Sequence, residues 1–323
     1  MLEERAAVDL DRRLVGAAQS RRLAAREDHG DEAHQARLDH GPESFSPHRA
    51  VRHTGGVTAP TSTSPQEALR IALVQAASSL DPDENRAALE ALTPADHDLV
   101  VFPEAFARDF GEAGSDVAQF AEQADGPFAK EVARVAADRR TTVVAGMFER
   151  GEDPERPFNT LLVRGAVEAD YRKIHLYDSF GYRESDRLTA GPLAPLVVDL
   201  AGWRVGLMTC YDLRFPELAR GLVDRGAELI IVPAAWVAGP RKADHWRTLV
   251  RARAIENTVY VAAVGQPAPR YTGHSLVADP LGDVVAETGA GSAEEPVVVS
   301  GVVERSVLAE ARRTNPSLAN RRL

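Results

Sequence analysis

The chain has 323 residues, a formal net charge of −10 and 44% hydrophobic residues, which is ordinary for a soluble globular protein. The acidic balance argues against a nucleic-acid partner, and no apolar run approaches the length of a membrane span. The single cysteine excludes an intrachain disulfide framework, and the first residues lack the apolar core of a secretory signal. We therefore expect a cytoplasmic protein.

Residues 1–66 differ in composition from the rest of the chain. Charged residues and histidines alternate with alanine, and the segment then passes into glycines and a run of Thr, Pro and Ser. Because aromatic and β-branched residues are scarce, little apolar surface is available to offset the entropy lost on ordering. We expect a disordered N-terminal extension and linker over residues 1–66, and one folded domain over 67–323. An Arg-rich targeting segment is the alternative, which the acidic residues argue against.

The first half of the expected domain alternates strands with helices. Apolar runs predict strands over 70–76, 98–102 and 141–147, and helical spacing predicts helices over 83–92 and 127–139. Residues 158–164 and 167–171 read as a hairpin around Gly165.

The second half begins with a buried strand over 203–209 and a helix over 215–223. A strand over 229–233 and a strong helix over 244–257 follow, and the remaining strands are predicted over 259–264, 273–278, 283–286 and 297–303. The late strands cluster as hairpins, which indicates an α/β fold of two mixed sheets packed together with helices outside.

Three predicted strand ends carry unusual polar residues: Glu104, Lys173 and Cys210. Each follows apolar sequence, where a charge is costly unless it is paired. Taken singly, each has an ordinary structural explanation: Glu104 could begin a helix, Lys173 could lie in a surface turn, and Cys210 could be core. Taken together, they supply a thiol, a base for it and an ammonium that stabilises negative charge. That set suits acyl transfer at a carbon bonded to nitrogen.

The segments around these residues resemble the nitrilase superfamily of carbon–nitrogen hydrolases. The resemblance extends from about residue 70 to near the end and rests on five motifs: Val101-Phe102-Pro103-Glu104, Tyr171-Arg172-Lys173-Ile174-His175-Leu176, Cys210-Tyr211-Asp212-Leu213-Arg214-Phe215-Pro216-Glu217, His245-Trp246 with Arg251-Ala252-Arg253-Ala254-Ile255-Glu256-Asn257, and Gly273-His274-Ser275-Leu276-Val277. It implies an αββα sandwich that dimerises to αββααββα, and hydrolysis without a cofactor.

The resemblance also implies the roles of individual residues. Glu104, Lys173 and Cys210 would be base, oxyanion partner and nucleophile, with Lys173 and the Tyr211 N–H holding the oxyanion. A second glutamate is expected between the lysine and the cysteine, for which Glu184 is the best match and Glu149 the competitor. The nine histidines show no metal-ligand spacing, so no metal is expected, and His175 and His274 are expected to be structural.

The cysteine motif and the His-Trp helix resemble the Nit branch, whose members are ω-amidases or deaminated glutathione amidases. We expect a small amide substrate that carries a carboxylate, gripped by Arg214 through two parallel hydrogen bonds. The equal alternative for Arg214 is an ion pair with Asp212 or Glu217. For the chain as a whole, the alternatives are an N-carbamoyl amidohydrolase, a nitrilase, or a catalytically idle binding scaffold.

Overall fold

The computed structural model describes residues 66–322, so the extension expected over 1–66 lies outside the described residues except for Gln66. The Gln66 N–H donates to the Ala201 carbonyl, and the Gln66 carbonyl accepts a 3.0 Å hydrogen bond from the Trp203 indole. Gln66 therefore belongs with the folded residues and not with the expected linker.

The first sheet has six strands in the order β14-β1-β2-β3-β4-β5. In that order the strands are Val297–Glu304, Ala68–Gln75, Leu99–Val101, Thr142–Glu149, Phe158–Arg164 and Ala169–Arg172. β1, β2 and β3 are parallel, whereas β14, β4 and β5 pair antiparallel with their neighbours. β2 and β3 are buried along their whole length, as expected for parallel strands covered on both faces.

The second sheet also has six strands, in the order β13-β12-β11-β10-β9-β8. In that order the strands are Val284–Glu287, Leu276–Ala278, Tyr260–Gly265, Leu229–Ala234, Trp203–Leu207 and Val197–Leu200. β9, β10 and β11 are parallel, and antiparallel strands complete both edges. A short separate hairpin is formed by β6 (Asp178–Ser179) and β7 (Tyr182–Arg183).

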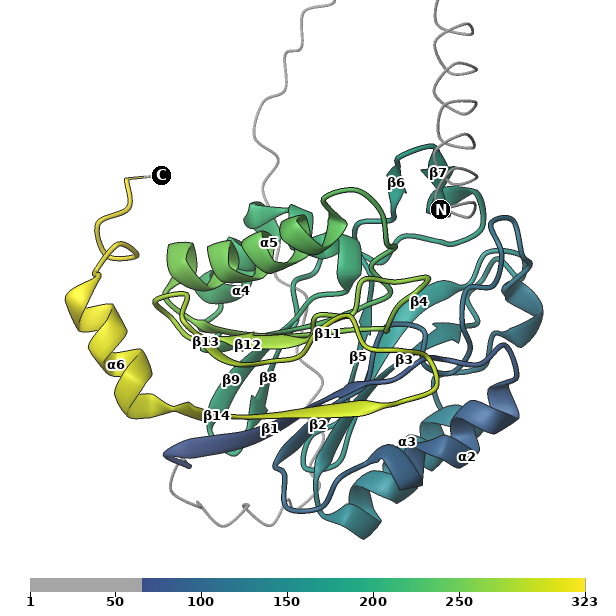
Figure 1. Cartoon of the computed structure of the whole chain (residues 1–323), viewed down its shortest axis with the longest axis horizontal. Coiled ribbons are helices and arrows are strands. Elements are labelled where there is room, and N and C mark those ends of the chain that lie inside the picture. Colours follow the sequence, from purple (N-terminus) through teal and green to yellow (C-terminus); the bar gives the residue numbers. More distant parts are fainter. Residues whose placement is uncertain (1–65, 323) are drawn as a thin grey trace, which may run out of the picture. The chain divides into compact units, whose positions relative to one another are not determined.

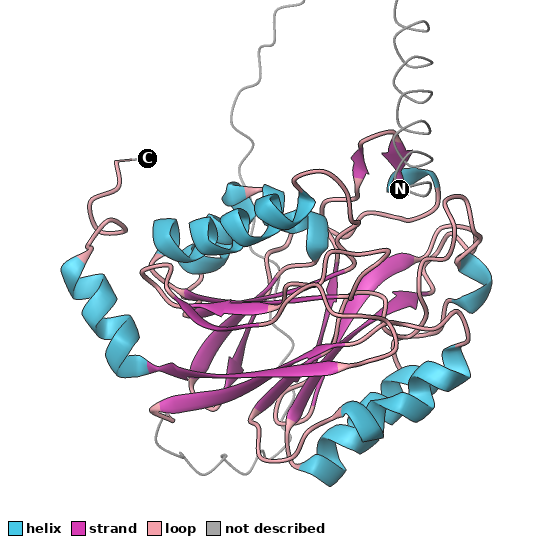
Figure 2. Ribbon diagram, viewed as in Figure 1, coloured by secondary structure: helices cyan, strands magenta, loops and turns pink. Residues whose placement is uncertain are grey.

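The helices lie outside the two sheets (Figures 1 and 2). α2 (Pro82–Leu92) and α3 (Pro127–Arg139) cover the first sheet, and α4 (Pro216–Asp224) and α5 (Lys242–Asn257) cover the second. α6 (Arg305–Thr314) continues from β14, and three 3₁₀ turns are η1 (Ala118–Phe120), η2 (Glu184–Asp186) and η3 (Cys210–Arg214). The predicted αββα sandwich is thus confirmed. None of the helices in residues 66–322 has both the length and the apolar character that a membrane span requires.

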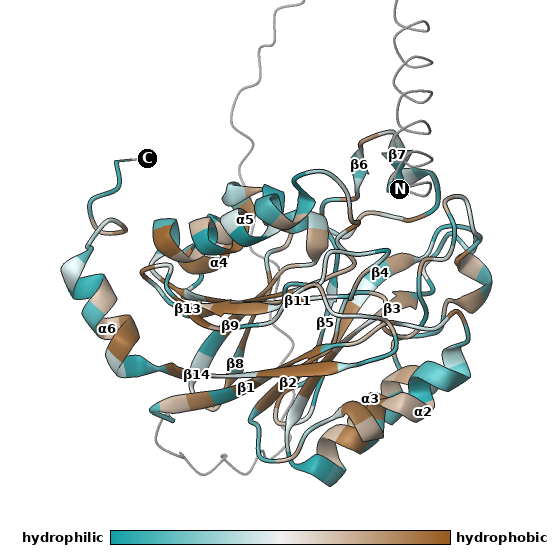
Figure 3. Ribbon diagram, in the orientation of Figure 1, coloured by the Kyte–Doolittle hydropathy of each residue, from teal (hydrophilic) through white to brown (hydrophobic). Residues whose placement is uncertain are grey.

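The main core fills the space between the sheets, where Figure 3 shows the strands to be strongly hydrophobic, and it continues on the other face of the second sheet under α4 and α5. Alternate residues of β1, Leu69, Ile71 and Leu73, pack into the same cluster as Trp203 of β9. A second cluster, which includes Phe128 of α3, fills the space between the first sheet and its helices. Each sheet is therefore buried on both faces over most of its area, and the polar strand ends are held on a rigid frame.

Most predicted elements occur within a few residues of their expected bounds. The strand predicted over 203–209 ends earlier, at Leu207, because the chain turns into η3 at Cys210. The strand predicted over 273–278 is only Leu276–Ala278, because His274 has a φ of 56° and breaks the extended conformation. β8, the β6–β7 hairpin and α6 were not predicted.

Candidate active site

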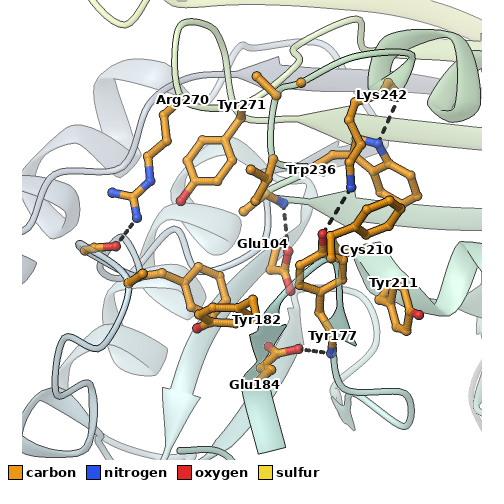
Figure 4. A pocket seen from close by; sticks show the side chains of 18 of the residues that line it. Glu104, Tyr177, Tyr182, Glu184, Cys210, Tyr211, Trp236, Lys242, Arg270 and Tyr271 are labelled. Carbon is orange, nitrogen blue, oxygen red and sulfur yellow. Dashed lines mark hydrogen bonds between the residues drawn. The ribbon is translucent and has the colours of Figure 1, made fainter. Parts of the chain in front are cut away.

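A cavity of about 730 Å³ brings the predicted site residues together. Glu104, Lys173, Glu184 and Cys210 all line it, although they come from segments that follow β2, β5, β7 and β9. Figure 4 shows Glu104, Glu184 and Cys210 around the cavity. Aromatic rings form much of the wall, contributed by Phe110, Tyr177, Phe180, Tyr182, Tyr211, Trp236 and Tyr271. An enclosed apolar wall strengthens electrostatic interactions between the few charged groups inside it.

Glu104 is buried, with 1% of its surface exposed, and its carboxylate is held from three sides. Its Oε1 accepts hydrogen bonds from Asn159 Nδ2 at 2.7 Å and from Lys173 Nζ at 2.9 Å, and its Oε2 accepts one from the Ala235 N–H at 2.7 Å. The Glu104 carbonyl also accepts a 3.0 Å bond from Gln266 Nε2. The roles of Asn159, Ala235 and Gln266 were not predicted. The sequence feature that could have pointed to Asn159 is a polar amide within an otherwise apolar strand.

Lys173 lies between two carboxylates. Its Nζ is 2.9 Å from Glu104 Oε1 and 2.9 Å from Glu184 Oε2, and all three side chains are almost completely buried. Burial opposes the charge, but the attraction of Glu104 and then Glu184 outweighs it and raises the pKa of Lys173 well above its ordinary value. Lys173 is therefore an ammonium whose direction is fixed by its two partners.

The structure pairs Lys173 with Glu184 and not with its competitor Glu149. Glu184 begins η2, and its Oε2 also accepts a hydrogen bond from the Tyr177 N–H at 2.5 Å. Burial, opposed by Lys173, raises the pKa of Glu184. Glu149 instead accepts hydrogen bonds from Arg172 at 2.6 Å and from Thr160 at 2.7 Å. Glu149 does not line the cavity.

Cys210 begins η3 in a left-handed backbone conformation, with a φ of 47°. A non-glycine residue pays roughly 1–2 kcal/mol for this conformation, so the surrounding structure must impose it. Burial, followed by the negative charge of Glu104, raises the pKa of the Cys210 thiol well above its ordinary value. The resting group is therefore a neutral thiol that needs a base, and Glu104 is the carboxylate next to it.

The predicted structural role of His175 is seen in its contacts. The His175 N–H and Nδ1 lie 3.0 Å and 2.8 Å from Asp212 Oδ1, and the ring stacks on Phe215 with centroids 3.7 Å apart. Tyr171 donates to Asp212 Oδ2 at 2.7 Å. The lysine segment and the turn after Cys210 are thus joined through one buried carboxylate.

The two remaining predicted residues also line the cavity. Tyr211 directly follows Cys210, within the first turn of η3, where backbone N–H groups have no partner in the helix itself. Arg214 forms no ion pair with Asp212 or Glu217, so within residues 66–322 the alternative predicted for it is wrong. Its guanidinium lies over the Trp236 ring, 4.8 Å from the centroid, and its buried Nε and Nη2 have no hydrogen-bond partner in the described structure.

Within the described part of the chain, no group of three or more His, Cys, Asp or Glu side chains is arranged to hold a metal ion. The described side chains bring a thiol, a carboxylate and an ammonium together in one cavity.

Comparison with known proteins agrees with this geometry. Residues 70–313 match the carbon–nitrogen hydrolase family. A hydrolase of Mycobacterium tuberculosis is 45% identical over 68% of this chain and 85% of its own length, and a deaminated glutathione amidase of Escherichia coli is 39% identical over 70% and 86%. A solved structure of a CN-hydrolase superfamily protein from Xanthomonas campestris is 33% identical, with a TM-score of 0.71 over 80% of this chain and 98% of that one. The chain belongs to the carbon–nitrogen hydrolase family of the nitrilase superfamily and is a hydrolase acting on carbon–nitrogen bonds.

Proposed function

We propose that this hydrolase cleaves a small carboxylate-bearing amide to an acid and an amine or ammonia through a thioester on Cys210. Glu104 takes the thiol proton as Cys210 Sγ attacks the amide carbonyl. Lys173 Nζ and the Tyr211 N–H stabilise the oxyanion, and Glu104 then gives the proton to the departing nitrogen. Glu104 next activates a water molecule, which releases the acid from the thioester.

The observation that carries this proposal is the shared position of Lys173 between Glu104 and Glu184. An ammonium held 2.9 Å from each carboxylate stays charged and cannot rotate freely. Because this charge is already fixed in place, the site does not have to reorganise when the oxyanion forms. Such preorganised charge stabilises the transition state electrostatically. In this proposal Glu184 positions Lys173, and Glu104 is the base.

The preference for an acidic substrate rests on Arg214. It lines the same cavity as Cys210 and has unpartnered, buried nitrogen atoms. A buried donor without a partner is costly, and a substrate carboxylate would satisfy it. The named activity of the relatives, deaminated glutathione amidase, is consistent with an acidic amide substrate.

A substrate panel tests the proposal. Ammonia or amine release would be measured with ω-amide acids, deaminated glutathione, N-carbamoyl amino acids, nitriles and uncharged amides. The proposal predicts the highest kcat/KM for amides that carry a carboxylate away from the scissile bond. A clear preference for N-carbamoyl amino acids or nitriles would replace it with one of those activities, and a preference for uncharged amides would remove the role of Arg214.

We further infer that the chain forms a homodimer in solution, as its superfamily resemblance implies. In support, β13 and β14 carry half-exposed apolar side chains at the edges of the two sheets, Val284, Val285, Val298 and Val302. Sedimentation equilibrium at micromolar concentration should show a dimer or a larger even-numbered oligomer, and a clean monomer would contradict this inference.

A further inference from the structure

Two of the cationic side chains that line the cavity have no counter-ion within the described residues. Four cationic side chains line the cavity: Lys173, Arg214, Lys242 and Arg270. Lys173 is paired with Glu104 at 2.9 Å, and Arg270 with Asp109 at 2.8 Å. Arg214 and Lys242 form no ion pair with any residue in the described range. Among the cationic side chains of the cavity, Arg214 and Lys242 are therefore the two without a carboxylate partner in the described structure.

One edge of the Arg214 guanidinium is buried and makes no hydrogen bond in the described structure. Its Nε and Nη2 atoms are buried and have no hydrogen-bond partner in the described structure. The N–H bonds of these two atoms are parallel and lie on the same side of the planar group, which is the arrangement that binds both oxygens of a carboxylate at once. The Arg214 Cζ atom lies 4.8 Å from the centroid of the Trp236 ring, which supports the guanidinium plane, and 5.7 Å from that of the Phe180 ring.

Lys242, at the start of α5, is equally short of a counter-charge although only 9% of its surface is exposed. Its Nζ donates to the Tyr177 hydroxyl at 3.1 Å and lies 3.6 Å from the centroid of the Phe180 ring. Burial, followed by the positive charge of Arg214, lowers the pKa of Lys242. A buried ammonium with only neutral partners is costly, and a bound anion would remove that cost.

We propose that Lys242 and Arg214 together bind the carboxylate of the substrate, and that Phe180 covers Lys242 when this site is empty. The inference rests on the proposed amidase function and extends it to a residue that sequence reasoning missed. The carboxylate lies side-on against Arg214 Nε and Nη2, and Lys242 Nζ donates to one of its oxygens.

Phe180 contacts Lys242 where the carboxylate oxygen would bind, and the oxygen would displace its ring. The ring lies against one side of Lys242 Nζ, so a carboxylate oxygen that approaches Nζ from that side must displace the ring. Phe180 lies at the turn of the β6–β7 hairpin, and 66% of its surface is exposed. The contact of a cation with an aromatic face at an exposed site is weaker than its contact with a carboxylate, so the carboxylate displaces the ring.

Binding to the Cys210→Ala variant tests the site without requiring turnover. The ligands are glutaramate and pentanamide, which have the same chain length and amide but differ in the terminal carboxylate. In the Cys210→Ala background, Lys242→Met should raise the Kd of glutaramate at least about tenfold, as expected for losing a charged hydrogen bond, and change that of pentanamide little. The matched control is Arg241→Met, because Arg241 is the exposed neighbour and carries the same charge; it should leave both Kd values unchanged.

Phe180→Leu, also in the Cys210→Ala background, tests the covering role separately. Removing the competing ring should tighten glutaramate binding about two- to fivefold and leave pentanamide unchanged. Unchanged or weaker glutaramate binding in this variant would contradict the covering role.

The outcomes separate this inference from the proposed function. If Lys242→Met weakens both ligands alike, Lys242 only braces Tyr177, and if glutaramate binding does not change, the carboxylate lies elsewhere; either result overturns the inference. If wild-type protein binds glutaramate through Lys242 but releases no ammonia from it, the binding site stands and the proposed amidase reaction fails.

Discussion

Asp212 lies two residues beyond Cys210, yet its carboxylate accepts a 2.7 Å hydrogen bond from Tyr171, which lies two residues before Lys173. Asp212 Oδ2 also accepts a 2.9 Å bond from the Thr209 N–H, and Oδ1 contacts two nitrogen atoms of His175. Asp212 is completely buried. The Asp212 carboxylate therefore joins Tyr171 and His175, on either side of Lys173, to the turn that carries Cys210.

Asp212→Asn should lower kcat at least about tenfold with a smaller change in KM, because an amide N–H₂ would face groups that donate to the present carboxylate. Steady-state kinetics on protein checked for folding by circular dichroism would measure this. Tyr171→Phe, which removes a single hydrogen bond, should give a smaller loss. A folded Asp212→Asn variant with normal kcat would show that Asp212 does not position the site.

Gly146→Ala should displace Glu104 and lower both stability and kcat. A Cβ at Gly146 would lie 2.4 Å from the Ala105 backbone nitrogen and 3.1 Å from the Glu104 Cα, so the backbone that carries the base would have to shift. Shifts of about 1 Å near reacting groups cost about 10²-fold in rate. Gly289→Ala is the control, since a Cβ there meets nothing within 4 Å. Equal kinetics and melting temperatures for the two variants would contradict this account.

Glu149→Gln should reduce stability in a pH-dependent way. Burial opposes ionisation, but the hydrogen bonds from Arg172 and Thr160 outweigh it and lower the pKa of Glu149 below its ordinary 4.5. Because the unfolded chain takes up the proton first, the stabilisation is fully present above about pH 4.5 and is lost as the pH falls through the lower native pKa.

Urea unfolding of wild type and Glu149→Gln at about pH 7, 5 and 4 would measure this effect. The difference should be about 1–3 kcal/mol at the two higher values and shrink at the lowest. Glu152→Gln, at an exposed neighbouring position, should show no such difference. A Glu149→Gln difference that does not depend on pH would rule out the ion pair as its source.

Arg214→Lys keeps the charge and removes the two parallel N–H groups. We expect a higher KM for glutaramate and little change in turnover of pentanamide, because only the acid uses the free edge of the guanidinium. Steady-state kinetics with both amides would measure the split. Equal losses on both substrates, or a fall in melting temperature alone, would make Arg214 a structural residue.

The residues that could be predicted from sequence are those with a local signal. Glu104 and Cys210 each follow a short apolar strand, and that pattern is visible within a few residues of each. Helices such as Pro127–Arg139 were predicted for the same reason, since spacing and a leading proline act locally.

The partners of these residues could not be predicted because they are distant in the chain. Asn159 contacts Glu104 across 55 residues, and Lys242 contacts Tyr177 across 65. The sequence around Lys242 does not show whether its ammonium is buried or lies exposed at the start of a helix. The edge strand β8 was missed because only two of its four residues are buried, which leaves too short a pattern to recognise.

In the proposed reaction, Cys210 carries the acyl group of the substrate as a thioester. The most direct measurement is mass spectrometry of wild-type protein quenched with acid within the first turnovers on glutaramate, followed by peptide mapping. We expect one added glutaryl group on the peptide that contains Cys210, which hydroxylamine removes and which Cys210→Ala never forms. An acyl group on another residue, or turnover by folded Cys210→Ala without any adduct, would contradict it.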